Sequence, residues 1–260
     1  MSSLRARCPD CRTLTAVAVD SGYQCHSCGR EFAAGLVRVP KAWGRPDEPG
    51  AGEGMARAAL MPVPYPETAV VDRETLVEQT KALSELLPER PVVLGGCCCA
   101  HVGAVRGLAA REGRLGVVWI DAHGDLNTAE TSPSGNLWGM PLRMLLDDGI
   151  VAPEDVALVG ARNLDPPEVA YLAETGIDDS LERALDGVDR VYIALDLDVL
   201  DPSEAMVFMP EPSGLRAADI ETILRAAAAR RGLAGVGVTG FLLATENIEV
   251  VTRFLAAGGF

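Results

Sequence analysis

Residues 117–125 read Val-Val-Trp-Ile-Asp-Ala-His-Gly-Asp, an apolar run that ends in a cluster of polar residues. Residues 191–198 read Val-Tyr-Ile-Ala-Leu-Asp-Leu-Asp and are organised in the same way. Uninterrupted apolar runs are typical of parallel strands that are covered on both faces. Because ligands bind at the carboxyl ends of strands in an open parallel sheet, both polar clusters are predicted to meet at one edge of the sheet.

Apolar runs and amphipathic segments alternate through the rest of the chain. Strands are predicted at 36–40, 92–94, 117–120, 156–159, 191–195 and 236–238. Helices are predicted at 75–87, 101–110, 140–147, 167–174, 180–186, 217–231 and 246–257. The Gly- and Pro-rich stretch 41–66 is predicted to be an irregular loop. This alternation predicts an α/β fold, a three-layer α/β/α domain with a mostly parallel sheet over residues 35–260.

Composition and charge narrow the class of protein. The chain has 260 residues, a hydrophobic content of 48% and a formal net charge of −14. This composition excludes wholesale disorder, and the acidity argues against nucleic acid as a partner because phosphates would be repelled. No apolar run reaches the roughly 18–20 residues of a membrane span, and the first residues lack the apolar stretch of a secretion signal. We therefore expect a cytoplasmic protein that does not interact with a membrane.

The first 34 residues carry a cysteine pattern of their own. Two Cys-x-x-Cys turns are formed by Cys8 with Cys11 and by Cys25 with Cys28. Four thiolates from two such turns suit the tetrahedral coordination of Zn²⁺. We predict a zinc ribbon over residues 1–34 with one structural Zn²⁺, the alternatives being two unrelated cysteine pairs or a redox site. We expect His26 to be a surface residue, and the ribbon to be structural or to dock a protein partner.

The polar residues after the two strands have the chemistry of a metal site. They are Asp121, His123, Asp125, Asp196 and Asp198. Four carboxylates in a small volume would repel one another unless cations neutralise them. Oxygen ligands with one nitrogen suit Mn²⁺, and less specifically Fe²⁺ or Zn²⁺. Carboxylates that bridge two cations would form a site that holds hydroxide near neutral pH. A single Asp-x-Asp could instead be a turn or a helix cap.

The motifs together resemble the ureohydrolase family, which includes arginase, agmatinase and formimidoylglutamase. The resemblance rests, in the family's order, on Gly95-Gly96, on residues 121–125, on residues 134–141 and on residues 194–202, and it extends over 35–260. It implies an arginase-like fold and two divalent metal ions, Mn²⁺ foremost with Zn²⁺ or Fe²⁺ as options. A hydroxide that bridges the ions would attack the carbon of a guanidinium or amidine group. The resemblance also implies a homo-oligomer.

The resemblance implies a role for each of these residues. Asp121 and Asp196 would bridge the metals, Asp125 would bind one ion, and His123 and Asp198 would bind the other. Asp125 and Asp121 are therefore the candidate catalytic residues, and Asp125 would take the proton of the hydroxide after attack. Substrate-binding roles are implied for two further residues, Asn127 and Ser134, which match positions that hold the amino-acid end of the substrate in arginases.

The first motif departs from the family's pattern. Where the family has Gly-Gly-Asp-His-Ser, this chain has two glycines followed by Cys97, Cys98 and Cys99. Cys98 takes the place of a histidine ligand, and a thiolate would favour zinc or iron over manganese at that ion. Alternatively, that ion is weakly held or absent. His101 could replace the ligand only if the loop were rearranged, so we expect it to be a helix-surface or packing residue. Cys97 and Cys99 are expected to be small core residues.

Two further motifs also differ. Trp138 stands where the family has a histidine that moves protons, and an indole can only donate a hydrogen bond. Trp138 could wall the substrate pocket or stack on a planar cation. Gly240 stands where arginases have a glutamate that contacts the guanidinium. The apolar residues 206–209 replace a polar turn, so either the pocket is more apolar than arginine would require or these residues simply pack under the loop.

These features favour a metal-dependent hydrolase of a C–N bond in a guanidino, amidino or formimino compound. The small-molecule substrate would be a linear amidine in this reading. The alternative is a non-catalytic relative that binds a metal or docks a partner, motivated by the missing histidine and glutamate. A third reading is an amide hydrolase similar to histone deacetylases, with one zinc held by Asp121, His123 and Asp196. The sequence lacks the paired histidines that such enzymes use.

Overall fold

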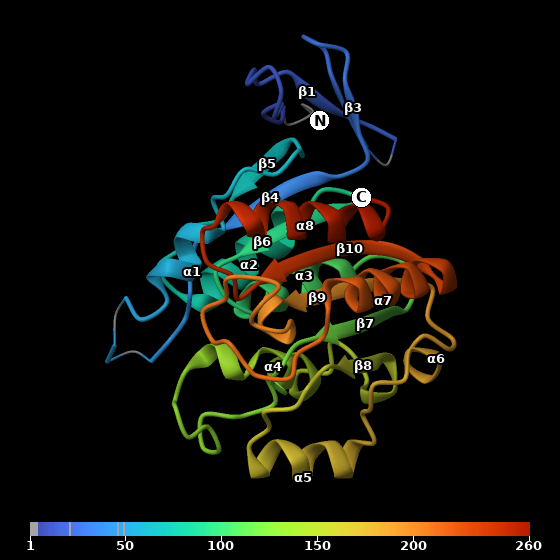
Figure 1. Cartoon of the computed structure of the whole chain (residues 1–260). Helices are drawn as coiled ribbons and strands as arrows, with labels where there is room; N and C mark the ends of the chain where they lie inside the picture. The colour runs from blue at the N-terminus through green and yellow to red at the C-terminus, as the bar shows by residue number, and fades with distance from the viewer. Residues whose placement is uncertain (1–4, 21, 46, 49) are drawn as a thin grey trace.

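A seven-stranded parallel sheet forms the centre of the protein (Figure 1). The computed structural model describes residues 5–20, 22–45, 47–48 and 50–260. The strands lie in the order β5-β4-β6-β10-β9-β7-β8, and every neighbouring pair is parallel. Their bounds are β4 (Gly35–Val39), β5 (Glu67–Val70), β6 (Pro91–Gly95), β7 (Leu115–Ile120), β8 (Val156–Val159), β9 (Arg190–Asp196) and β10 (Gly232–Thr239). The predicted parallel sheet is confirmed.

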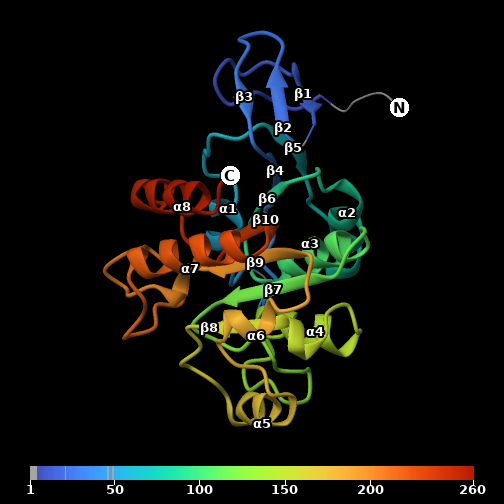
Figure 2. The ribbon, with the colours of Figure 1, turned by 90° about the vertical axis from the view of Figure 1, so that its right-hand side faces the viewer.

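Consecutive side chains of the central strands enter opposite cores, because side chains alternate between the two faces of a strand. In β9, Ile193 and Leu195 lie in one apolar cluster, whereas Tyr192 and Ala194 lie in the other. The first cluster includes side chains of α7 (Ala217–Arg230) and α8 (Thr245–Ala257). The second includes side chains of α2 (Leu76–Leu86), α3 (Cys99–Ala109) and α4 (Pro141–Asp147). Figure 2 shows these two groups of helices on opposite sides of the sheet, which confirms the three layers.

Two further helices lie between β8 and β9 along the chain, and the second of them contacts β8. They are α5 (Pro166–Thr175) and α6 (Leu181–Ala184). Pro166 and Pro167 stand at the start of α5, where a backbone N–H has no intrahelical partner, so its absence in proline loses no hydrogen bond. Gly176 ends the helix in the left-handed conformation. No helix in the described part of the chain is both long and apolar enough to cross a membrane.

The prediction of an irregular loop over 41–66 is wrong in part, because α1 (Glu53–Ala58) lies within it. This helix has only six residues and includes Gly54, so its intrinsic helix propensity is low. Met55 and Ala58 are buried, and this packing stabilises what the local sequence does not indicate. Strand β5 was also not predicted. Its residues Glu-Thr-Ala-Val are few and half-exposed, and they carry no apolar run.

The cysteine-rich segment forms a separate three-stranded antiparallel sheet. Its strands are β1 (Ala16–Val19), β2 (Gly22–Cys25) and β3 (Glu31–Phe32). Figure 1 shows this small sheet beyond β5, at one end of the molecule. Arg7 connects it to the main sheet: the Arg7 N–H donates to the Glu67 carbonyl at 3.0 Å, and the Glu67 N–H donates to the Arg7 carbonyl at 3.1 Å. The segment thus pairs with β5, the edge strand of the main sheet.

Candidate metal centre

The ends of four neighbouring strands bring polar side chains to one edge of the sheet. Cys98 follows β6, Thr239 ends β10, Asp196 ends β9, and residues 121–125 follow β7. These four strands are adjacent in the order β6-β10-β9-β7. Because they are parallel, their carboxyl ends lie side by side, and side chains that are far apart in the sequence come into contact.

The site consists of two overlapping groups that share Asp121. In each group the donor atoms lie within 4.8 Å of one another: one group is Cys98, Asp121 and Asp125, and the other is Asp121, His123 and Asp198. His123 Nδ1 lies 3.0 Å from Asp198 Oδ2 and 3.4 Å from Asp121 Oδ1. Cys98 Sγ lies 3.6 Å from Asp121 Oδ2.

Asp196 belongs to neither group, although it lies beside both. Its Oδ2 accepts a hydrogen bond from Cys98 Sγ at 2.9 Å and one from Thr239 Oγ1 at 3.0 Å. Its Oδ1 accepts from the Asp198 N–H at 2.9 Å. The carboxylate therefore fixes the turn after β9 and the thiol after β6. Asp121 is the carboxylate whose position fits a ligand shared by two ions.

A tight turn after β7 presents Asp125 to the cluster. Asp125 has φ of 53°, in the left-handed region that few residues other than glycine adopt. Hydrogen bonds hold the turn from both sides: the Ala122 N–H donates to Asp198 Oδ1, and the Leu126 N–H donates to Glu168 Oε1. Such strain persists only where the surrounding structure enforces it, and it is concentrated at functional sites.

Burial raises the pKa of every carboxyl group in the cluster. Asp121, Asp125, Asp196 and Asp198 are at most 6% exposed. Burial and then Asp198 raise the pKa of Asp196 to about 7, and burial and then Asp121 raise the pKa of Asp198 to about 6. Burial and then Asp121 also hold the pKa of Asp125 well above its usual range. Crowded carboxylates are unfavourable in this environment unless a cation compensates them.

Unpaired atoms in the cluster supply a test of whether cations fit. Asp125 Oδ2 and His123 Nε2 are buried, and neither has a hydrogen-bond partner among the described residues. Burial opposes the charged form of His123, but hydrogen bonds that its imidazole donates to Asp121 and Asp198 outweigh it and raise its pKa to about 12. The two groups together hold three buried carboxyl groups, one thiol and a single imidazole. An oxygen-rich donor set with free buried lone pairs fits divalent cations.

Sequence and fold comparisons identify the family of this protein. A model of the arginase family matches residues 54–240, which is more than half of the chain. The chain belongs to the arginase family. Arginase from Bacillus caldovelox is 40% identical over a stretch that covers 44% of this chain and 48% of that protein. Arginase from Staphylococcus aureus strain COL is 37% identical over 44% of this chain and 47% of its own length. The chain thus spans about half the length of the curated relatives it matches.

Solved structures share the fold over more of the chain. The native structure of the Bacillus caldovelox arginase at pH 5.6 has a TM-score of 0.70 and 26% identity, covering 86% of this chain and 97% of that one. Formimidoylglutamase from Bacillus subtilis has a TM-score of 0.69 over 86% of each chain, with 19% identity. The latter supports the fold alone. Together they confirm the arginase-like architecture of the main domain.

Cys98, the first departure from the arginase-family pattern, lies inside the cluster. It precedes the first turn of α3 and is 5% exposed. Burial, and then the charge of Asp125, hold the pKa of its thiol well above the usual range. Cys97 and Cys99 pack instead with Met55 in a small apolar cluster, as expected of core residues. Cys97 Sγ also accepts a hydrogen bond from the Trp43 N–H at 3.3 Å.

His101 is not a member of either ligand group. Its ring is 1% exposed and packs edge-on against Trp119, with ring centroids 5.1 Å apart. Its Nδ1 lies 3.0 Å from the Tyr192 hydroxyl, and its Nε2 lies 3.2 Å from Thr239 Oγ1. Burial lowers the pKa of this imidazole to about 3, so the ring is neutral. Of the two expected environments, the helix surface and the packed interior, His101 has the second, and its two nitrogens are engaged within the core.

The cavity beside the cluster has a volume of about 240 Å³ and is lined by all three residues expected to bind substrate. Asn127 is 5% exposed, and its Nδ2 donates to Asp165 Oδ2 at 2.8 Å. Ser134 Oγ accepts from the Asn136 N–H at 3.2 Å. The Trp138 ring meets Phe208 edge-on, with centroids 5.8 Å apart. The structure therefore gathers Asn127, Ser134 and Trp138 around one space.

Two residues that were not predicted to belong to the site contact the cluster. Thr239 connects Cys98 Sγ, at 3.3 Å, to the His101 ring. Its signal was present, because it is a polar residue at the end of an apolar strand. Glu211 Oε1 lies 3.5 Å from His123 Nε2, without a hydrogen bond between them. Glu211 lies in a loop between β9 and α7, and nothing in its local sequence indicates this contact.

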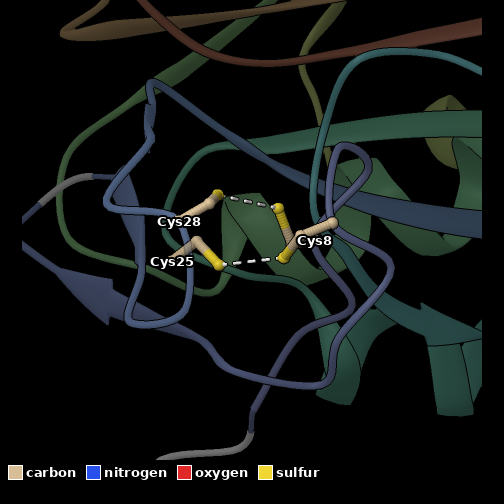
Figure 3. A group of neighbouring side chains, drawn as sticks. Cys8, Cys25 and Cys28 are labelled. Carbon is tan, nitrogen blue, oxygen red and sulfur yellow. Dashed lines mark hydrogen bonds between the residues drawn. The ribbon is translucent and has the colours of Figure 1, made fainter.

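The four cysteines of the N-terminal segment form a second cluster whose sulfur atoms lie within 4.8 Å of one another. Cys8 Sγ lies 3.8 Å from Cys28 Sγ, and Cys11 Sγ lies 3.6 Å from Cys25 Sγ. Figure 3 shows the side chains of Cys8, Cys25 and Cys28 pointing toward a common centre. His26 is exposed, as expected of a surface residue. The cluster and its antiparallel sheet fit a small zinc ribbon.

Proposed function

We propose that this protein is a metal-dependent hydrolase that cleaves a C–N bond in a guanidino, amidino or formimino compound. The observation that carries the proposal is the pair of donor groups that share Asp121 and border a cavity. Membership of the arginase family supports it, because the relatives that match are named arginases. The curated relatives align with this chain over only about half of their length, so the activity of the relatives is a proposal for this chain.

Six residues would hold two divalent cations in this proposal. They are Cys98, Asp121, His123, Asp125, Asp196 and Asp198. Cations bound there would compensate the carboxylates and lower the pKa of coordinated water, which supplies a nucleophile near neutral pH. Mn²⁺ suits the oxygen donors, while a thiolate at Cys98 would favour Zn²⁺ or Fe²⁺ on its side of the site. In the ribbon, four cysteines would hold one structural Zn²⁺.

The protein's own residues would orient the substrate and move the proton. Asp125 Oδ2 is buried and free of other partners, so it can accept a proton and return it to the leaving amine. Asp121 would align the donor groups on both sides. Trp138 is placed to stack on the planar carbon group of the substrate, and the cavity it lines would exclude bulk water. Asn127 would act indirectly, because both of its amide atoms are already hydrogen-bonded.

Replacement of Asp125 tests the proposal. In protein loaded with Mn²⁺, Zn²⁺ or Fe²⁺, we expect Asp125→Asn to lower kcat by about 10²–10⁴-fold, since the proton acceptor is lost. Release of urea or ammonia from a panel of guanidino, amidino and formimino compounds measures turnover. Asp186→Asn is the matched control, because Asp186 is exposed and lies outside the cavity. Equal turnover by both variants would contradict the mechanism.

A further inference from the structure

The cavity beside the metal centre has an apolar wall. Trp138, Phe208, Met55 and Met209 line it together with the carboxylates. The Trp138 ring is held firmly: a Cβ at Gly44 would lie 2.7 Å from it, so only glycine allows this contact. The Trp138 N–H donates to the Trp43 carbonyl at 3.1 Å, which fixes the backbone below the ring. The wall is thus a built surface with aromatic and thioether side chains.

A carboxylate on the substrate would find no cationic partner in this cavity. None of the described residues that line it is a lysine or an arginine, whereas six are Asp or Glu. Even with two divalent cations bound, these six carboxylates would leave the lining with a net negative charge. A substrate carboxylate would be repelled, and it would lose hydration without gaining an ion pair.

Two arginines that contact cavity residues or their neighbours are already engaged. Arg45 packs near Gly135, but its Nε and a terminal nitrogen bind Asp47 at 3.0 and 2.7 Å. The Arg162 guanidinium donates to the carbonyls of five residues, namely Gly160, Asp198, Val199, Glu211 and Pro212. Neither side chain could turn to a substrate without losing these bonds.

Two polar residues on the cavity wall, Asn127 and Glu168, are likewise hydrogen-bonded to the protein. Asn127 donates to Asp165 and accepts from Thr131 Oγ1 at 2.9 Å. Glu168 accepts from the Leu126 N–H with one oxygen and from the Asp165 N–H, at 2.9 Å, with the other. These groups hold the loops around the cavity. Beside the carboxylates and the polar side chains of Ser132, Ser134, Asn136 and Asn163, the cavity presents its apolar wall to a tail.

Building on the proposed function, we propose that the substrate carries its guanidine or amidine group on an apolar tail without a carboxylate. The planar cationic group would face the metal centre, and the tail would contact Phe208 and Met209. Burial of an apolar tail is favoured by about 25 cal/mol per Å². Met209 is 37% exposed and belongs to the same loop as Phe208, so it would cover the end of the tail.

Binding to the Mn²⁺-loaded protein tests the inference directly. We expect calorimetry to show that benzylguanidine binds at least about tenfold more tightly than 4-guanidinobutyrate or agmatine, since a tenfold ratio needs only about 1.4 kcal/mol. The same order is expected in kcat/KM. Tighter binding of 4-guanidinobutyrate would overturn the inference. Tighter binding of agmatine would also overturn it, because the preferred tail would then carry an amine.

A pair of methionines supplies matched variants. Met209 lines the cavity, whereas Met206, three residues earlier, is 54% exposed and does not line it. We expect Met209→Ala to weaken benzylguanidine binding and Met209→Arg to strengthen 4-guanidinobutyrate binding, each by about tenfold or less. Met206→Ala and Met206→Arg should change neither affinity. Equal effects at both positions would overturn the assignment of the tail to this wall.

The panel separates this inference from the proposed function. Hydrolysis of carboxylate-bearing guanidines in preference to benzylguanidine would support the proposed hydrolase activity and contradict the proposed apolar tail. If the metal-loaded protein neither bound nor hydrolysed any guanidine or amidine tested, both the proposed function and this inference would be contradicted.

Discussion

Gly240 determines how closely two strands can approach at the metal centre. Its φ is 73°, and a Cβ at this position would lie 1.8 Å from Asp196 Oδ1. Arginases carry a glutamate at this place in the resemblance described above, and no such side chain can be accommodated while Asp196 keeps its position. A side chain at position 240 would therefore require Asp196 to move.

Gly240→Ala should consequently disturb the centre. Alanine would be strained in the left-handed backbone of this position and its Cβ would clash with Asp196, so we expect a loss of about 1–3 kcal/mol in the free energy of unfolding and a lower metal content. Denaturant unfolding and elemental analysis measure the two effects. Gly232→Ala is the control, since Gly232 begins the same strand and has no atom within 4 Å of its added Cβ. Equal losses in both variants would contradict the argument.

At the scale of elements, the close packing of α2 and α3 depends on glycines. A Cβ at Gly107 would lie 2.6 Å from the Ser84 carbonyl oxygen, on the backbone of α2. A Cβ at Gly54 in α1, by contrast, would meet only the flexible end of Leu242 at 3.0 Å. Rigid backbone cannot move aside as a side chain can, so the same substitution has opposite consequences in the two helices.

We expect Gly107→Ala to destabilise the protein by about 1–3 kcal/mol, because overpacking outweighs the gain in helix propensity. Gly54→Ala should leave stability unchanged or raise it by up to about 1 kcal/mol. Chemical denaturation of both variants measures the difference. A stabilising effect of Gly107→Ala would show that α2 and α3 can separate at little cost.

An ion-pair network joins α7 to α8. Glu221 Oε2 lies 2.6 Å from the Arg225 guanidinium, and Glu221 Oε1 contacts Arg253 of α8. Hydrogen bonds from Arg225 and then Arg253 lower the pKa of Glu221 below its ordinary value of 4.5. The unfolded chain therefore binds a proton at a higher pH than the folded one, and the contribution is present above pH 4.5 and lost as the pH falls through the folded pKa.

Glu221→Gln should flatten this pH dependence. Between pH 6 and pH 3 we expect the wild-type protein to lose more unfolding free energy than the variant, and the two curves to converge in acid. Glu249→Gln, an exposed position on α8, supplies the control and should follow the wild type. Parallel curves for wild type and Glu221→Gln would show that the network does not affect stability.

The sequence predicts most of these elements because of their apolar runs. Strands β6, β7, β9 and β10 are buried on both faces, and this is what uninterrupted apolar residues indicate. The same reasoning places Asp121 and Asp196 at one edge. Contacts made by the loop between β9 and α7, such as that of Glu211 with His123, depend on tertiary packing and leave no local signal. Helix α1 is missed for the same reason.

On the scale of the whole molecule, the cysteine cluster and the main sheet are joined mainly through β5. An unpaired edge strand is prone to pair with another chain, and Arg7 covers part of this edge. We propose that residues 1–34 and 35–260 are two domains with separate metal sites. The ribbon's metal would then stabilise the small sheet, and the small sheet would protect the edge of the large one.

Cys25→Ser tests this arrangement. We expect the variant to lose one Zn²⁺ per chain, to keep the metal content of the main centre, and to aggregate faster, because β5 is uncovered. Elemental analysis and light scattering measure these effects. His26→Ala, at an exposed neighbouring position, should behave as the wild type. Loss of the main centre's metals in Cys25→Ser would contradict the division into two domains.

The left-handed backbone of Asp125 has a consequence for how the protein tolerates change. Glycine at position 125 would relax the turn, so Asp125→Gly would combine a more robust fold with an inert centre. Selection for thermal stability alone would favour that replacement, whereas selection for turnover would oppose it. The aspartate at this position therefore lowers the stability of the turn while it provides the carboxylate on which the proposed reaction depends.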